Sequence, residues 1–341
     1  MLIDEIAKEH NLTLKQLSAD SNIAYTTLMS MKDSSILDWK SQYIDAVSKA
    51  LATDIKKLAE KEVLTPFIKW VGGKRQLLNE LKKYVPDDFG TYYEPFIGGG
   101  ALFLNLQPDK AVINDFNPEL TNLWRVVKSQ PEELVELLRT HQINNSKEYY
   151  LDLRLMDRDG RIVSMSEVER AARFMYMNKT GFNGLWRVNS KGQNNVPYGK
   201  YANPTIVSPM IIPINKYLSE KNVKIKTGDY QEVVTTAETG DFVYFDPPYI
   251  PASSTSVFTS YTANGFGLVQ QEQLRDTALK LAKRGVRVML SNADVPLIEE
   301  LYSDSLFEIH HVQATRAINS KSSARGKVGE VIITAGLRKR D

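Results

Sequence analysis

"TYYEPFIGGGALFLNL" (residues 91–106) joins a predicted strand to a glycine-rich turn and then to a predicted helix. Glycines in such a turn let the backbone approach a ligand at the start of a helix. The dinucleotide fingerprint GxGxxG does not fit, because the sixth position counted from Gly98 is Phe103. A tight turn without a ligand has the same pattern, so this stretch alone identifies no ligand.

From residue 65 onward, short apolar runs alternate with helical stretches, a pattern that indicates an α/β sheet. Seven strands are expected, at 91–96, 111–114, 223–227, 241–245, 286–291, 307–313 and 330–335. Helices are expected between most of them, such as 118–128, 271–284 and 294–302. The interval 129–220 is too long for a simple crossover, so we expect an inserted subdomain there. Its predicted parts are helices at 132–141, 147–156 and 166–178 and a polar loop at 178–201.

Residues 1–62 differ from the rest, because apolar residues recur at helical spacing and strand signals are few. Thr13 and Gln16 match a capping box, and Asn22 suits the left-handed residue of a tight turn between two helices. This layout resembles the helix-turn-helix of Cro/repressor-type modules. An all-helical packing or dimerisation module without DNA contact is the alternative, since residues 1–60 hold seven lysines against nine acidic residues.

The composition excludes several classes of function. The 341 residues include no cysteine, which rules out disulfides, thiolate zinc sites and cysteine nucleophiles. The four histidines show no metal-ligand spacing, so no metal is expected. With a net charge of +2, any nucleic-acid surface must be a local patch. The N-terminus lacks a signal-peptide pattern and no run is long enough to cross a membrane, which predicts a cytoplasmic protein, with a monomer favoured.

Two further stretches could contact a nucleoside. "AVIND" (111–115) is a buried strand that ends in Asp115, where a carboxylate could accept both ribose hydroxyls. Capping of the following helix is the alternative for this residue. "PFIKWVGGKRQLL" (66–78) places Trp70 and Lys74 around a Gly-Gly turn. An aromatic plane and a cation suit a nucleoside with a carboxylate tail, although the start of an exposed helix would give the same pattern.

"DFVYFDPPY" (241–249) carries the most specific chemical signal. An apolar strand delivers Asp246, and the two prolines that follow form a rigid, extended turn without N–H donors. The Asp246 carboxylate and the Pro247 carbonyl are then both acceptors, and Tyr249 adds an aromatic face. Two acceptors beside a stacking ring predict a site for a planar –NH₂ group. A proline-rich strand end without a ligand is the alternative.

These motifs, in this order, resemble the DNA adenine-N6 methyltransferase (Dam) family of the D12 class. The resemblance spans 66–337 and also includes "FMYMNKTGFNGLWRVNSKGQNNVPYGKY", "LSN" and "RAINSKSSARGKVGEVII". It implies a seven-stranded, Rossmann-like, S-adenosylmethionine-dependent methyltransferase fold with a helical DNA-recognition subdomain. The expected domains are therefore an all-α helix-turn-helix domain at 1–62 and an adenine methyltransferase domain at 66–341, with 129–220 inserted as the target-recognition subdomain.

The resemblance also implies roles for single residues. The residues that would contact S-adenosylmethionine are Trp70, Lys74, Phe96, Gly98, Gly100, Asp115, Asp229, Tyr230 and Asp246. The catalytic residues would be Asp246, Pro247 and Tyr249. The residues that would contact double-stranded DNA are Lys69, Phe182, Asn183, Leu185, Arg187, Pro197, Tyr201, Arg316, Lys321 and Arg325. Among these, Phe182 matches an aromatic residue, usually Tyr in relatives, that inserts at the flipped site.

The resemblance also implies GATC as the target sequence, and the chemistry of three residues is compatible with it. Arg187 can hold a guanine with two hydrogen bonds, while Leu185 and Pro197 can meet thymine methyl groups or can simply pack. The basic residues of 316–327 would grip phosphates, which gives affinity without sequence information.

The expected reaction is direct methyl transfer to N6 of an adenine that has swung out of the duplex. The missing cysteine excludes cytosine-C5 methylation. The tetrapeptide DPPY (246–249) begins with Asp, which favours adenine over cytosine N4. One alternative is a helix-turn-helix transcription regulator with an inactive methyltransferase-like domain. Another is an RNA or protein-glutamine methyltransferase, because a fold does not fix its substrate. A restriction–modification system, a phage or a housekeeping pathway would each be compatible with the enzyme.

Overall fold

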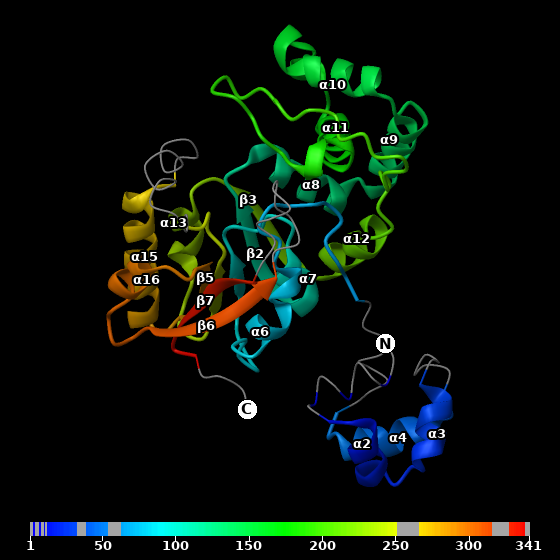
Figure 1. Ribbon diagram of the computed structural model, residues 1–341, viewed down its shortest axis with the longest axis vertical. Coiled ribbons are helices and arrows are strands. Elements are labelled where there is room, and N and C mark those ends of the chain that lie inside the picture. Colours follow the sequence, from blue (N-terminus) through cyan, green and yellow to red (C-terminus); the bar gives the residue numbers. More distant parts are fainter. Residues whose placement is uncertain are drawn as a thin grey trace. The chain divides into compact units, whose positions relative to one another are not determined.

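The computed structural model describes residues 12–32, 39–53, 63–250, 266–315 and 327–337, and the single residues 3, 7 and 10. The chain forms two compact units, Met1–Leu64 and Thr65–Asp341 (Figure 1). Each unit has a hydrophobic core of its own.

The described part of the first unit consists of the short helices α2 (Leu14–Ser21), α3 (Tyr25–Met31) and α4 (Ser41–Ala50). Thr13 caps α2 with the predicted capping box, in which the Gln16 N–H donates to Thr13 Oγ1 at 3.3 Å. Asn22 ends α2 in the left-handed conformation, at φ 54°, as the tight turn requires. The side chains that form the common core include Leu17, Leu28 and Val47. DNA binding by these helices stays a prediction.

The second unit is built on the predicted seven-stranded sheet. Its strands are β1 (Tyr92–Glu94), β2 (Lys110–Asp115), β3 (Asn222–Thr227), β4 (Phe242–Phe245), β5 (Arg287–Ala293), β6 (Glu308–Thr315) and β7 (Lys327–Ala335). The strand order is β3-β2-β1-β4-β5-β7-β6, with β7 antiparallel between β5 and β6 and the other pairs parallel. The order reverses at β1 and β4, and α/β sheets bind their ligands beyond the carboxyl ends of the strands at such a reversal.

Helices cover both faces of this sheet (Figure 1). One face carries α7 (Ala101–Leu106), α8 (Pro118–Ser129) and α12 (Ile211–Glu220), with α6 (Leu78–Lys82) beside α7. The other face carries α13 (Tyr230–Val233), α15 (Leu268–Lys283) and α16 (Pro296–Leu301). Because side chains alternate along a strand, Phe245 and Leu290 join the cluster under α15. Tyr92 packs on the opposite face, against Phe103 of α7.

The interval between β2 and β3 forms a helical insertion, as predicted. Between α8 and α12 it holds α9 (Pro131–Ile143), α10 (Lys147–Asp159), α11 (Glu167–Thr180) and a polar hairpin. Helix α11 packs against α8 and α9. A buried ion pair of 2.8 Å between Arg173 and Asp157 joins α11 to α10. The insertion is therefore attached to the sheet through α8 and has its own buried polar contacts.

Candidate active site

Two tryptophans shape the glycine-rich turn between β1 and α7. Gly98 and Gly100 have φ values of 46° and 68°, in the left-handed region that favours glycine. A Cβ at Gly98 would lie 2.6 Å from Cδ1 of Trp70, and one at Gly100 would lie 2.8 Å from Cζ2 of Trp124. The close approach of these rings therefore requires both glycines, and their contact with a ligand stays a prediction.

Asp115 lies against the same turn, at the end of β2. Its Oδ2 accepts the Gly98 N–H at 3.1 Å, and its Oδ1 accepts the Asn117 N–H at 3.0 Å. The cap of α8 is Asn117, whose side chain accepts the first free N–H groups of the helix, so the alternative of Asp115 as the cap is wrong. Burial raises the pKa of Asp115 and the backbone N–H donors oppose that rise. The neighbouring Phe116 side chain is 78% exposed.

Lys74, Asp246 and Tyr249 meet beyond the carboxyl end of β4. Lys74 Nζ lies 2.7 Å from Oδ1 of Asp246 and 4.6 Å from the centroid of the Tyr249 ring. Burial raises the pKa of the Asp246 carboxyl, and the Lys74 ammonium opposes this rise. The structure thus brings Lys74, which is distant in the sequence, to the neighbouring residues Asp246 and Tyr249.

Ser291 of β5 supports the Asp246 carboxylate from the sheet. Its Oγ donates to Oδ1 of Asp246 at 2.9 Å and lies 3.0 Å from the Tyr244 hydroxyl. Among the described residues, hydrogen bonds and ion pairs to this carboxylate all reach Oδ1. Oδ2 is therefore left as an acceptor for another group.

The backbone around Tyr249 is held on both sides. Gln271 of α15 donates from Nε2 to the Pro248 carbonyl at 2.9 Å. The Ile250 N–H donates to Oδ1 of Asn292 at 3.0 Å, and Asn292 is itself hydrogen-bonded to Gln271. Two neighbouring elements, α15 and β5, therefore fix the path of the chain through the tetrapeptide.

A second carboxyl group is buried close to this site, at the end of β1. Glu94 Oε2 accepts hydrogen bonds from the Tyr92 hydroxyl at 2.6 Å and from the Phe103 N–H at 3.2 Å. Burial raises the pKa of Glu94 to about 8, and the nearby Asp246 adds to the rise. Glu94 is therefore largely protonated at neutral pH.

Asn178 joins the loop of Trp70 to the inserted subdomain. Its amide is fully buried; Oδ1 accepts the Lys69 N–H at 3.1 Å, and Nδ2 donates to the carbonyls of Lys69 and Gly184, both at 2.8 Å. The Trp70 ring also lies 6.3 Å from the Phe174 ring of α11. The loop beside the glycine-rich turn and the polar hairpin are thus held by one side chain.

The polar hairpin, residues 181–199, is paired through bridges between Gly181 and Tyr198 and between Val188 and Asn194. Helix α10 supports it from one side, because Tyr150 and Arg154 both donate to the Val196 carbonyl at 3.0 Å. The two bridges and the hydrogen bonds from α10 fix the backbone of the hairpin. Side chains on the side away from α10 are left free to contact a partner.

The described residues that are predicted to contact DNA lie on the hairpin and at the contact between Lys69 and Tyr201. Phe182, Arg187 and Pro197 are exposed on the hairpin, whereas Asn183 and Leu185 are partly buried there. Tyr201 lies under Lys69, whose Nζ is 4.7 Å from the ring centroid. The predicted phosphate contacts Arg316, Lys321 and Arg325 lie outside the described residues.

Two residues predicted to contact the cofactor differ in their surroundings. Asp229 is exposed and caps α13. The Tyr230 side chain is only 8% exposed, and its ring packs 5.1 Å from that of Phe96 in the core cluster. Any contact of Tyr230 with a ligand would therefore be made by a small part of its surface.

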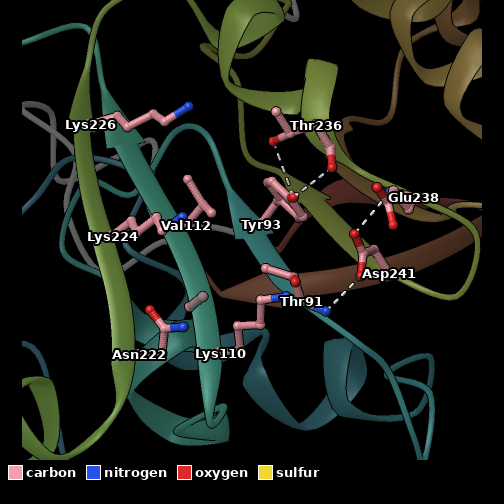
Figure 2. A pocket seen from close by; sticks show the side chains of 11 residues that line it. Thr91, Tyr93, Lys110, Val112, Asn222, Lys224, Lys226, Thr236, Glu238 and Asp241 are labelled. Atoms are coloured by element: carbon pink, nitrogen blue, oxygen red, sulfur yellow. Dashed lines mark hydrogen bonds between the residues drawn. The ribbon is translucent and has the colours of Figure 1, made fainter.

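A separate groove of about 280 Å³ lies along β1, β2 and β3 (Figure 2). Its lining includes Tyr93, Lys110, Lys224, Lys226 and Asp241. Asp241 accepts the Thr91 N–H at 2.6 Å, and Tyr93 donates to the Thr236 carbonyl at 3.1 Å. None of the predicted site residues lines it, so the groove is not part of the candidate active site.

Several functional contacts were not predicted from the sequence. They involve Ser291 and Asn292 of β5 and Glu330 of β7, which are far from residues 246–249 in the sequence. They also involve Gln271 of α15 and Asn178 of α11. The only sequence signal for any of them is the motif character of "LSN" and of the stretch around Glu330. Within the described residues, no group of three His, Asp or Glu side chains could hold a metal ion, and no helix is long and apolar enough to cross a membrane.

The chain is similar to known proteins over most of its length. A family model described as D12 class N6 adenine-specific DNA methyltransferase matches residues 70–318. Type II methyltransferase M1.LlaDCHI of Lactococcus lactis subsp. cremoris is 59% identical over 272 residues, which cover 80% of this chain and 95% of that one. Type II methyltransferase M.MjaIII of Methanocaldococcus jannaschii is 41% identical, over 76% of this chain and 94% of that one. The DNA adenine methylase of Escherichia coli (strain K12) is 34% identical, over 78% and 93%.

Proposed function

The chain belongs to the D12 class of N6 adenine-specific DNA methyltransferases, and on that premise we propose which residues perform the transfer and which DNA sequence they read. The enzyme transfers a methyl group to N6 of adenine in DNA. Its family implies S-adenosylmethionine as the methyl donor. When bound, this cofactor supplies an electrophilic methyl group on a sulfonium ion.

The residues around the glycine-rich turn fit such a cofactor chemically. Oδ2 of Asp115 accepts the Gly98 N–H and Oδ1 accepts the Asn117 N–H, and the carboxylate retains lone pairs for ribose hydroxyls. Phe116, exposed beside it, offers an apolar face for the adenine ring. The Lys74 ammonium suits the carboxylate of the methionine part. We propose these three residues as cofactor contacts, with Trp70 shaping the turn.

The observation that carries the proposed mechanism is the position of Lys74 Nζ. It is 2.7 Å from the Asp246 carboxylate and 4.6 Å from the Tyr249 ring, so a polar nitrogen at this place contacts an acceptor and an aromatic ring at once. An adenine amino group at Oδ2, the oxygen that Lys74 and Ser291 leave as an acceptor, would contact the same carboxylate beside the same ring. We propose that Asp246 and the Pro247 carbonyl accept the two N6 hydrogens while Tyr249 stacks on the base.

This arrangement requires the target base to leave the duplex, because N6 is not accessible inside the stack. Acceptors on the N6 hydrogens increase electron density on the nitrogen where the new bond forms. The chain's own contribution is therefore positioning and electrostatic stabilisation by groups that are already in place. Neither a covalent intermediate on the protein nor a metal ion enters this scheme.

We propose GATC as the target sequence, read by the hairpin that α10 supports. Arg187 is exposed there, with its Nε donating to Asn195 Oδ1 at 2.6 Å. This bond orients the guanidinium and leaves its two terminal NH₂ groups for guanine O6 and N7. Leu185 and Pro197 would contact thymine methyl groups, and Phe182, 45% exposed, would enter the space of the flipped base.

Transfer of a labelled methyl group from S-adenosylmethionine tests this proposal directly. Two duplexes are compared, one containing GATC and one with the same bases scrambled, with the protein and its Asp246→Ala variant side by side. N6-methyladenine in the GATC duplex alone, lost in the variant, is the expected result. Label in both duplexes would refute the sequence specificity, and full activity of the variant would refute the role of Asp246.

A further inference from the structure

Glu330 of β7 is a buried carboxylate with an unusual setting. It is 8% exposed and lies opposite Ala293 of β5 in the strand pairing. No described cation lies within ion-pair distance of it, although ion pairs are found for many other acidic residues. Burial of a carboxylate is costly unless hydrogen bonds compensate. Its described partner is the Tyr249 hydroxyl, which donates to Glu330 Oε2 at 2.9 Å.

This bond completes a three-point support of Tyr249. The chain on either side is held through the Pro248 carbonyl and the Ile250 N–H, which fixes the start of the side chain. The hydroxyl is held by Glu330 at the far end of the ring. Rotation about the Cα–Cβ bond would carry the hydroxyl away from Glu330 and break this hydrogen bond, so the direction of the long axis of the ring is fixed.

The hydrogen bond to Glu330 reaches the hydroxyl at the edge of the ring, and none of the three supports covers a ring face. Lys74 Nζ lies over one face, 4.6 Å from the ring centroid. Stacking depends on where the ring lies, and a small displacement would separate the N6 atom from its acceptors.

We propose that Glu330 is a positioning residue that fixes where the Tyr249 ring lies for the flipped adenine. It acts through Tyr249 and touches neither the substrate nor the cofactor. The inference rests on the proposed function, because it requires Tyr249 to stack on the target base. It assigns to the antiparallel strand β7 a part in catalysis.

The test compares Glu330→Ala with Glu330→Gln in the full-length protein. The Gln side chain keeps a carbonyl oxygen that can accept the hydroxyl hydrogen bond, whereas Ala removes it. We expect kcat at saturating DNA and cofactor to fall about tenfold in the Ala variant, with the cofactor Kd changed less than twofold. The Gln variant should recover most of the rate. Equal rates of Glu330→Ala and the unaltered protein would overturn the inference, as would equal losses in both variants.

Tyr249→Phe provides a second, independent readout, because it removes the hydroxyl and keeps the ring. Its kcat should fall about as much as that of Glu330→Ala. The double variant Tyr249→Phe/Glu330→Ala should lose no more than either single one. A kcat loss in the double variant equal to the product of the two single losses would overturn the inference. If Glu330→Ala does not fold, Tyr249→Phe and Glu330→Gln decide the matter.

The matched control is Tyr93→Phe, which removes a hydrogen-bonded tyrosine hydroxyl in the separate groove and should leave kcat unchanged. The unaltered protein distinguishes the two levels of proposal. If it transfers no methyl group to adenine in DNA, the proposed function fails and the inference falls with it. If it does so and the variants behave otherwise than expected, the inference alone fails.

Discussion

The ammonium of Lys74 lies 2.7 Å from Oδ1 of Asp246, with the two side chains 7% and 19% exposed. The same carboxylate oxygen accepts the hydroxyl of Ser291. A cation and a hydroxyl therefore both favour the ionised form of a carboxyl whose pKa burial would otherwise raise further. This pair supports a carboxylate that must accept hydrogen bonds during the reaction.

Replacing Lys74 by Met should shift the pH dependence of the reaction. Without the ammonium, the pKa of Asp246 rises further, so more of the carboxyl is protonated and unable to accept both N6 hydrogens. The acid limb of kcat, measured at saturating cofactor between about pH 5 and 9, should move to higher pH, with a loss of about tenfold or more at neutral pH. Lys83→Met, which removes an exposed lysine paired with Glu80, should leave the profile in place. An unmoved acid limb in Lys74→Met would contradict the coupling.

Gly98→Ala should disrupt the turn that Gly99→Ala leaves intact. At Gly98 a Cβ would lie 2.6 Å from Trp70 and φ is +46°, so both crowding and backbone strain apply. At Gly99 the nearest atom is 3.4 Å away. Urea unfolding should show a loss of about 1–3 kcal/mol for Gly98→Ala and a clearly smaller one for Gly99→Ala. Weaker cofactor binding should accompany the first change, and equal losses would show that the close contact does not matter.

Arg187→Lys should reduce sequence discrimination more than it reduces general DNA affinity. Lys keeps the positive charge but cannot make the paired hydrogen bonds of a guanidinium. The ratio of kcat/KM for a GATC duplex to that for AATC should therefore fall about tenfold, while binding to unrelated DNA changes little. Arg139→Lys, on exposed α9, is the control. A ratio that stays constant in Arg187→Lys would remove this residue from base recognition.

Glu94→Gln should be more stable than the unaltered protein at high pH. Burial raises the pKa of Glu94 to about 8 in the folded protein, from an ordinary value of 4.5 for a solvated glutamate. Between these values the unfolded chain loses the proton and the folded one keeps it, so the free energy of unfolding falls as pH rises, by at most about 1.4 kcal/mol per pH unit. The neutral Gln removes this term.

The advantage of the Gln variant over the unaltered protein should therefore grow from pH 5 to pH 8 in thermal unfolding. Glu136→Gln, an exposed residue, should show no such trend. A constant difference between Glu94→Gln and the unaltered protein over this range would mean that Glu94 is ionised in the folded state.

Local patterns carried the fold prediction a long way. All seven strands were predicted, because each is a short apolar run bounded by turn residues, and the capping box at Thr13 and the left-handed Asn22 depend only on neighbouring residues. The partners of the tetrapeptide could not be predicted in this way. Ser291 is 45 residues from Asp246, and Glu330 is 81 residues from Tyr249. The first contact depends on the pairing of β4 with β5 and the second also on that of β5 with β7, which no local pattern encodes.

The same limit applies to the alternative in which Asp115 caps α8. Asp115 and Asn117 are both good capping residues, and the sequence cannot say which one faces the helix. In the structure the Asn117 side chain caps α8, while Asp115 turns to the Gly98 N–H. The choice is made by the glycine-rich turn, which lies next to β2 only because β1 and β2 are paired.

The buried Asn178 has a thermodynamic consequence. It bonds the backbone on both sides of a junction, at Lys69 beside the glycine-rich turn and at Gly184 in the hairpin. A ligand that orders one of these loops therefore reduces the conformational entropy that ordering the other would cost. Linkage makes such an effect mutual: whatever factor the cofactor adds to DNA affinity, DNA must add to cofactor affinity. Replacing Asn178 by Ala should weaken this mutual effect, even with every ligand contact in place.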